Sequence, residues 1–200
     1  IVAFALLFVY LRYADKVYRV NSTAILKDQN KTTIRGGNAI FSGLDIAGTV
    51  NNIDNEIEVI RSKSIVIGVV NQLNLHTSYL VKGRVKDSDL YTSSPITVSM
   101  TQEDLDSLKA PLRFTVVRNA DKSISISRME RDEVTKTEKE HVKKILQLPV
   151  LYNTSAGKVT LALRPEVSWS EGSPIEVVIS PPAQVVNSYR SRLAVSPTSK

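Results

Sequence analysis

The hydrophobic pattern of the chain opens with an uninterrupted apolar run. Residues 1–11 have no polar face, which is typical of a helix that lipid or a protein core surrounds. At ~1.5 Å per residue a helix of this length reaches about 17 Å, roughly half of the ~30 Å hydrocarbon core of a bilayer. We therefore expect residues 1–13 to be the C-terminal half of a transmembrane helix that begins upstream of residue 1. A signal-peptide core and a buried helix are the alternatives.

A change of periodicity follows this run. Residues 18–26 alternate between two faces and predict a strand that leads out of the membrane. Residues 28–50 are rich in Asn, Thr and Gly and predict a long loop. Residues 54–73 carry the clearest helical pattern, in which Asn55 and Glu58 resemble a capping box. At about 100° per residue, one apolar face of this helix collects Val59, Val66, Val69, Val70 and Leu73.

The rest of the chain shows mainly strand patterns. The alternating segments are residues 78–85, 96–100, 113–118, 123–127, 158–163, 175–179 and 193–195. Residues 119–122 separate two of these segments and predict a hairpin. The segments with helical signals are residues 101–109, 130–144 and 180–190.

These elements predict an α+β fold with a mixed β-sheet flanked by helices. We expect residues 18–26, 175–179 and 193–195 to share that sheet, with the helices at 54–73 and 182–189 packed on it. Such a sheet would form the membrane-proximal base of the protein.

The order of the elements also predicts a division into three parts. Residues 1–13 form the partial transmembrane helix, and residues 14–85 together with 173–200 form the membrane-proximal α+β domain. Residues 86–172, in which strand signals dominate, form an inserted β-rich lobe.

Composition narrows the class of protein only a little. The 200 residues carry a net charge of +6 and are 42% hydrophobic, so the chain can bury a sizeable core. Basic and acidic residues are interspersed, as in residues 130–144, which is not the footprint of a nucleic-acid-binding protein. The absence of Cys excludes disulfides and thiolate metal sites, and it fits both a reducing and an oxidising compartment.

Candidate chemistry is sparse. His76 and His141 lack the spacing of metal ligands. Residues 155–158 resemble a phosphate loop, but the upstream glycine is missing and Val159 stands where Ser or Thr is needed, so they predict a hairpin turn. Motifs for serine hydrolases and zinc proteases do not occur. We predict no catalytic, cofactor-binding or metal-binding residue in this chain.

Several segments carry a family resemblance by their order and spacing. They are residues 18–26 (YRVNSTAIL), 55–64 (NEIEVIRSKS), 69–75 (VVNQLNL), 155–157 (SAG), Pro182-Ala183 with Tyr189, and 193–195 (LAV). In these segments the chain resembles the chain-length determinant (Wzz) family of polysaccharide co-polymerases. The similarity is strongest to the Wzc-like branch, whose members carry a cytoplasmic tyrosine autokinase.

The resemblance implies a bacterial inner-membrane protein with this domain in the periplasm. Such a protein controls the chain length or export of capsular polysaccharide or exopolysaccharide by scaffolding as a homo-oligomeric ring. Its implied partners are the polysaccharide polymerase, the outer-membrane export machinery and lipid-linked glycan. The implied tyrosine-kinase domain would lie beyond Lys200, so these 200 residues are expected to be non-enzymatic. A periplasmic glycan-acting enzyme with a carboxylate pair, and an envelope adaptor unrelated to polysaccharide, are the alternative functions.

Overall fold

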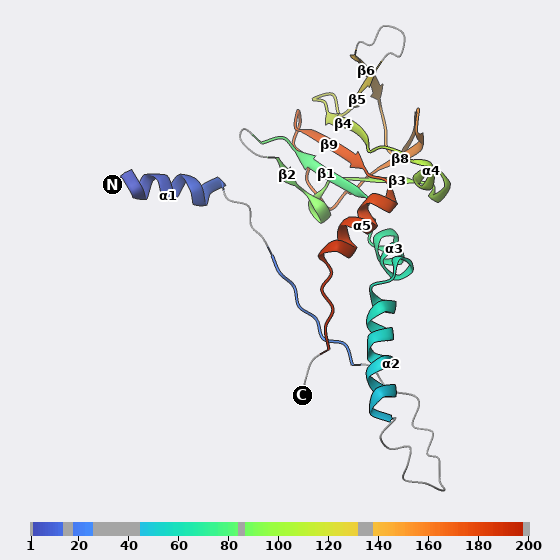
Figure 1. The fold of residues 1–200 in the computed structure, drawn as a ribbon. Helices are drawn as coiled ribbons and strands as arrows, with labels where there is room; N and C mark the ends of the chain where they lie inside the picture. The colour runs from blue at the N-terminus through green and yellow to red at the C-terminus, as the bar shows by residue number, and fades with distance from the viewer. Residues whose placement is uncertain (1, 14–17, 26–44, 84–86, 132–137, 198–200) are drawn as a thin grey trace. The chain divides into compact units, whose positions relative to one another are not determined.

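The computed structural model describes residues 2–13, 18–25, 45–83, 87–131 and 138–197 (Figure 1). The chain divides into two compact units, Ile1–Asn55 and Glu56–Lys200. In the first unit, helix α1 spans Val2–Tyr13. Residues 18–25 form no strand, so the prediction of a strand there is wrong over those residues, and residue 26 lies outside the described part.

Helix α1 is apolar. Phe4, Phe8 and Leu11 are all exposed to solvent. Of the helices that the structure describes, none has the length and apolar composition needed to cross a membrane.

The predicted helix over residues 54–73 is in fact two helices. Helix α2 spans Asp45–Ile60 and helix α3 spans Lys63–Gln72. Ser62 adopts an extended backbone between them, and its hydroxyl accepts a hydrogen bond from the Ile65 N–H at 3.3 Å. A serine side chain that caps a new helix competes with continuation of the old one, which explains the break. Because α2 begins at Asp45, the end of the predicted loop is helical, and residues 28–44 lie outside the described part.

The strands of the second unit form two antiparallel sheets. The larger has the order β2-β1-β9-β4-β5-β6 and the smaller has the order β3-β8-β7. The larger sheet consists of β1 (Thr77–Val81), β2 (Ser88–Asp89), β4 (Leu112–Arg118), β5 (Ile124–Arg131), β6 (Glu138–Ile145) and β9 (Pro174–Ile179). The smaller sheet consists of β3 (Ile96–Met100), β7 (Val150–Thr154) and β8 (Gly157–Leu163).

The sheets correct three predictions. Every pairing between the described strands is antiparallel, so the sheet is not mixed. Residues 193–195 form no strand. The predicted helix at 130–144 is wrong where it is described, because β5 and β6 pair there in continuous register from Ile124↔Ile145 to Arg131↔Glu138. This hairpin escaped prediction because β6 is a charged edge strand with little apolar alternation.

Strand β9 lies at the centre of the larger sheet. Val177 pairs with Tyr79 on one side and with Phe114 on the other, and all three side chains are buried. Since β4, β5 and β6 come from the predicted insert at 86–172 and join β9 in the same sheet as β1, residues on both sides of the predicted boundaries share one sheet.

Side chains from both sheets make a single apolar core. It includes Ile96 and Leu161 from the smaller sheet together with Phe114 and Ile126 from the larger. Tyr79 also joins the sheets, because its hydroxyl oxygen accepts a hydrogen bond from the Val98 N–H at 2.8 Å. Burial raises the pKa of Tyr79, although the hydrogen bond from Val98 and the charge of Arg164 oppose the shift.

Helices α3 and α5 pack on each other rather than on the face of the sheet. Helix α5 spans Pro182–Arg192 and begins at a proline, as the sequence predicts. Val66 and Val70 of α3 and Val186 of α5 form a small core of their own, and the two helices lie side by side in Figure 1. The Arg190 Nε donates a hydrogen bond to the Arg61 carbonyl at 3.0 Å, which ties α5 to the end of α2.

Candidate functional site

A cavity lies beside helix α4 (Gln102–Ser107) and has a volume of about 550 Å³. This size falls within the ~300–1,000 Å³ of small-molecule sites. Its walls come from α4 and the loop after it, from β5, and from the turn between β7 and β8. The lining residues are Asp104, Ser107, Leu108, Lys109, Ala110, Pro111, Leu112, Arg128, Ser155, Ala156 and Gly157.

The turn between β7 and β8 builds one wall. Thr154 pairs with Gly157, which confirms the hairpin turn predicted at residues 155–158 but limits it to Ser155 and Ala156, because β8 begins at Gly157. The Thr154 hydroxyl donates to the Gly157 carbonyl at 2.7 Å and accepts from the Ala156 N–H at 3.2 Å. The backbone polar groups of this turn are therefore largely satisfied within it.

Asp104 fastens α4 to that turn. Its Oδ2 accepts a hydrogen bond from the Lys158 N–H at 3.1 Å, and its own N–H donates to the Thr101 hydroxyl at 3.3 Å. Gly157 has a φ of +125°, and a Cβ added there would lie 2.6 Å from the Cγ of Asp104. Only glycine fits this close approach, so the contact between α4 and the turn depends on it.

Two cationic side chains are among the lining residues of the cavity. Arg128 occupies an inward position of β5, in line with Ile124 and Ile126, and its Nη2 donates to the Ser155 hydroxyl at 2.6 Å. Lys109 is exposed, and its ammonium group has no hydrogen-bond or ion-pair partner among the described residues. Asp104 is the one acid among the lining residues.

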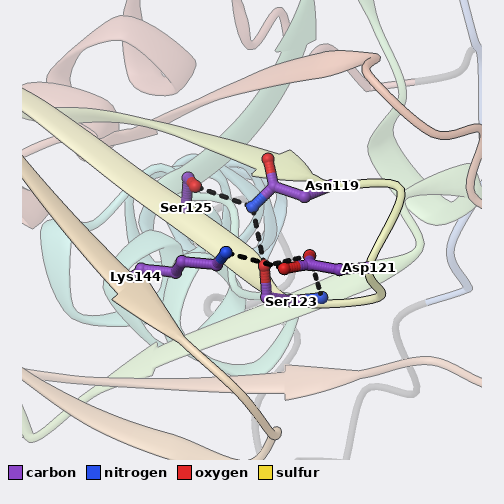
Figure 2. Close-up of polar contacts among 5 residues, drawn as sticks. All are labelled: Asn119, Asp121, Ser123, Ser125 and Lys144. Atoms are coloured by element: carbon purple, nitrogen blue, oxygen red, sulfur yellow. Dashed lines mark hydrogen bonds and ion pairs between the residues drawn. The ribbon is translucent and has the colours of Figure 1, made fainter.

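A second polar cluster closes the β4–β5 turn and is shown in Figure 2. The Asn119 side-chain amide donates to the hydroxyls of Ser123 and Ser125, at 2.9 and 2.8 Å. Asp121 accepts from the Ser123 N–H at 3.1 Å and from its hydroxyl at 2.5 Å, and its other oxygen lies 2.6 Å from the Lys144 Nζ. The hydrogen bond from Lys144, followed by those from Ser123, lowers the pKa of Asp121 to about 2.

The contacts of this second cluster indicate a structural role. The Ser123 hydroxyl already donates to an ionised carboxylate, and an anionic acceptor with so low a pKa is a poor general base near neutral pH. The Lys144–Asp121 ion pair instead ties β6 to the turn between β4 and β5.

The two histidines of the chain, His76 and His141, lie far apart in the strand order of the larger sheet. His76 immediately precedes β1, whereas His141 lies on β6 at the opposite edge. His76 is buried with its Nδ1 unpartnered among the described residues, and burial lowers its pKa. In the described ranges no three His, Asp or Glu side chains are grouped as metal ligands would be. The expectation of no metal, cofactor or catalytic residue stays a prediction.

A third candidate is an apolar surface on α3. Ile65, Val69 and Leu73 are spaced by four residues and are 48%, 44% and 54% exposed, so they form one stripe beside the face that contacts α5. We call these three side chains the α3 stripe. The predicted five-residue apolar face is thus only partly buried, because α5 covers just Val66 and Val70.

Sequence reasoning missed the cavity because its residues lie far apart along the chain. One signal was present: Arg128 continues the inward alternation of Ile124 and Ile126, and an arginine at an inward position of a strand indicates a polar site. The positions of Ser107 and Lys109 relative to Ser155 depend on how the sheets pack, which periodicity does not reveal.

The structure therefore defines an α+β domain with two antiparallel sheets, a pair of helices that pack on each other, and a cavity beside α4. Comparison with protein-family models, with curated proteins and with solved structures finds no match.

Proposed function

We propose that this chain is the periplasmic part of an inner-membrane polysaccharide co-polymerase, which controls the chain length or export of a capsular polysaccharide or exopolysaccharide by scaffolding as a homo-oligomer. The family resemblance of residues 55–64 and 69–75 supplies the class of function. Helix α1 would be part of a membrane anchor.

The structural observation that supports an assembly role is the α3 stripe. Residues 55–64 and 69–75 overlap the end of α2 and much of α3, and the second of these segments contains Val69 and Leu73 of the stripe. Contiguous exposed apolar patches can mark the sites where a protein meets a partner. A second copy of the chain that buries Ile65, Val69 and Leu73 would remove that surface from water.

Two experiments test this function. Deleting the gene should change the amount or length distribution of surface polysaccharide, measured by gel electrophoresis of the extracted glycan. Complementation with a Val69→Lys variant should fail to restore the distribution, and the purified variant should show a smaller mass by light scattering. Ser64→Lys adds the same charge to the same helix outside the stripe and should behave like the wild type. An unchanged polysaccharide after deletion would refute the proposal.

A glycan-acting enzyme is the second candidate, and its mark would be two buried carboxylates about 5–10 Å apart. The buried polar side chains in the described ranges are those of His76, Ser94 and Ser123. No observation on the described residues favours this candidate.

A further inference from the structure

His76 lies at the place where the helical pair of α3 and α5 joins the sheets. The chain passes from α3 into β1 through residues 73–76, and from β9 into α5 through Ser180 and Pro181. The Ser180 N–H donates a hydrogen bond to the His76 carbonyl at 2.8 Å. The two segments that connect this helical pair to the sheets are therefore bonded to each other at His76.

Along the chain, His76 stands between the two cores. Leu75, the residue before it, packs against the core of the helical pair. Tyr79, three residues after it, belongs to the core between the sheets. His76 itself is 5% exposed, and its Nδ1 has no hydrogen-bond partner among the described residues. A charge on this side chain would therefore act at the boundary between the two cores.

The segments around His76 carry almost no charge. Residues 64–81, which hold most of α3 and all of β1, have no Lys, Arg, Asp or Glu, and neither do residues 177–189, which join β9 to α5. The charged residue of β9 is Glu176, which pairs with Arg113 of the neighbouring strand β4 at 3.2 Å. The other titratable residues of α3, β1 and α5 are Lys63, Tyr79, Tyr189, Arg190 and Arg192. On these elements a protonated His76 would thus find no carboxylate except the one that Arg113 already binds.

Burial makes the neutral form of His76 the one that fits the folded arrangement. It lowers the pKa of His76 below the ordinary value of 6.5, because the imidazolium loses the water that would solvate it. A state in which this side chain is exposed takes up its proton near the ordinary value. The folded junction is therefore at its full stability above about pH 6.5 and loses stability as the pH falls below that value.

We propose that His76 is a pH-sensitive switch between the helical pair and the sheets. When its imidazole takes up a proton in mildly acidic solution, the junction with Ser180 opens, and α3 and α5 separate from the ends of β1 and β9 while the sheets stay folded. Asn71 of α3 favours the same opening, because its side-chain oxygen is buried without a hydrogen-bond partner among the described residues. Water could bond both this oxygen and the His76 Nδ1 in the open state, which lowers the cost of opening. This inference does not depend on the proposed function.

The test follows the two histidines of the whole chain by NMR between about pH 8 and pH 5, and measures hydrogen exchange over the same range. Exchange is expressed as protection factors, which removes the intrinsic dependence of amide exchange on pH. We expect the imidazole of His76 to titrate below its ordinary value. Protection in α3 and α5 should fall by up to about tenfold per pH unit below pH 6.5, the limit for an opening linked to one proton. Protection in β4 and β9 should stay the same.

Two variants distinguish the switch from a general effect of acid. His76→Gln keeps a polar side chain that cannot be protonated in this range, and it should abolish the pH dependence of protection in α3 and α5. His141→Gln removes the other histidine, which is exposed on β6, and should behave like the wild type.

Three results would overturn the inference: constant protection of α3 and α5 across the pH range, an equal fall of protection in the strands, or the same fall in His76→Gln. The wild-type titration decides the matter if His76→Gln does not fold. A His76 imidazole that titrates at or above its ordinary value would then refute the switch, and one that titrates below it together with the loss of protection in α3 and α5 would support it.

Discussion

The two clusters of buried side chains in the second unit differ in how much holds them together. The core between the sheets joins residues that range along the chain from β1 to β9, among them Phe114, Ile126 and Leu161. The core between α3 and α5 contains three buried residues, Val66, Val70 and Val186. At about 1.5–3 kcal/mol per buried large apolar side chain, the helical pair gains far less than the sheets from its own burial.

The two regions also differ in their exposed surfaces, which are charged on strand β6 and apolar on helix α3. The outer strand β6 carries His141, Lys143 and Lys144, and charged side chains on an edge strand discourage pairing with other chains. Helix α3 instead exposes the α3 stripe. The sheets are therefore stabilised by their internal packing, and the charged β6 edge disfavours pairing with another chain. The helical pair has a small core and an exposed apolar surface that suits a partner.

The largest expected effect lies in the core between the sheets. Phe114→Ala removes a side chain that is 2% exposed, and the lost burial and the resulting cavity should lower the free energy of unfolding by about 3–5 kcal/mol. Denaturant unfolding followed by tryptophan fluorescence measures this, because Trp169 belongs to the same core. A loss below about 1 kcal/mol would contradict the picture of a tightly packed core.

Gly157→Ala should have the next largest effect. The new methyl group would lie 2.6 Å from the Asp104 Cγ and 2.7 Å from the Met100 Cε, at a φ of +125° that alanine rarely adopts. We expect a loss of about 2–4 kcal/mol in the free energy of unfolding. Thermal unfolding measures this loss. Unchanged stability would mean that the turn is not fixed against α4.

Val186→Ala tests the helical pair. The side chain is fully buried against α3, and its truncation should cost about 2 kcal/mol. Hydrogen exchange should show protection lost in α3 and α5 but kept in β4 and β9, if the two cores are as separate as their packing indicates. Equal loss in the strands would show that the helices and sheets unfold as one cooperative body.

Gly68→Ala should raise stability slightly. Gly68 lies inside α3, and a Cβ added there meets no atom within 4 Å. Alanine reduces the conformational entropy of the unfolded chain and favours the helix, so we expect a gain of about 0.5–1 kcal/mol. Gly157 is required because another segment approaches its backbone closely, whereas no atom lies close to Gly68. A destabilised Gly68→Ala variant would contradict this distinction.

The smallest effect concerns Asp121 and its ion pair. Its pKa is lowered from 3.8 to about 2, so the contribution of this carboxylate to folding is complete above its ordinary pKa and is lost as the pH falls from about 4 through 2. Asp121→Asn should therefore have a flatter dependence of melting temperature on pH in that window. Side-chain exposures of 56% for Lys144 and 54% for Asp121 keep the effect small and sensitive to salt. Identical pH profiles would show that the Asp121–Lys144 ion pair in Figure 2 does not stabilise the fold.

The alternation of apolar and polar residues located most of the strands, but it did not show which strands pair with each other. Residues 96–100 and 175–179 were predicted as strands and are β3 and most of β9, because alternation and β-branched residues report a half-buried pleated surface. The hairpin after residue 118 was also correct. Strands β6 and β7 escaped prediction, since an edge strand exposes much of its surface and carries little apolar alternation.

By itself the sequence determined the α+β class, the position of α5 after its prolines, the α4 segment and the turn at 155–158, because each depends on residues within a few positions of one another. Only the tertiary structure decided that β9 lies between β1 and β4, that α3 and α5 cover each other instead of the sheet, and that Lys109, Arg128 and Ser155 line one cavity. The physical reason is that these contacts join segments far apart in the chain. Their stability depends on the shapes of the surfaces that meet, which no local periodicity contains.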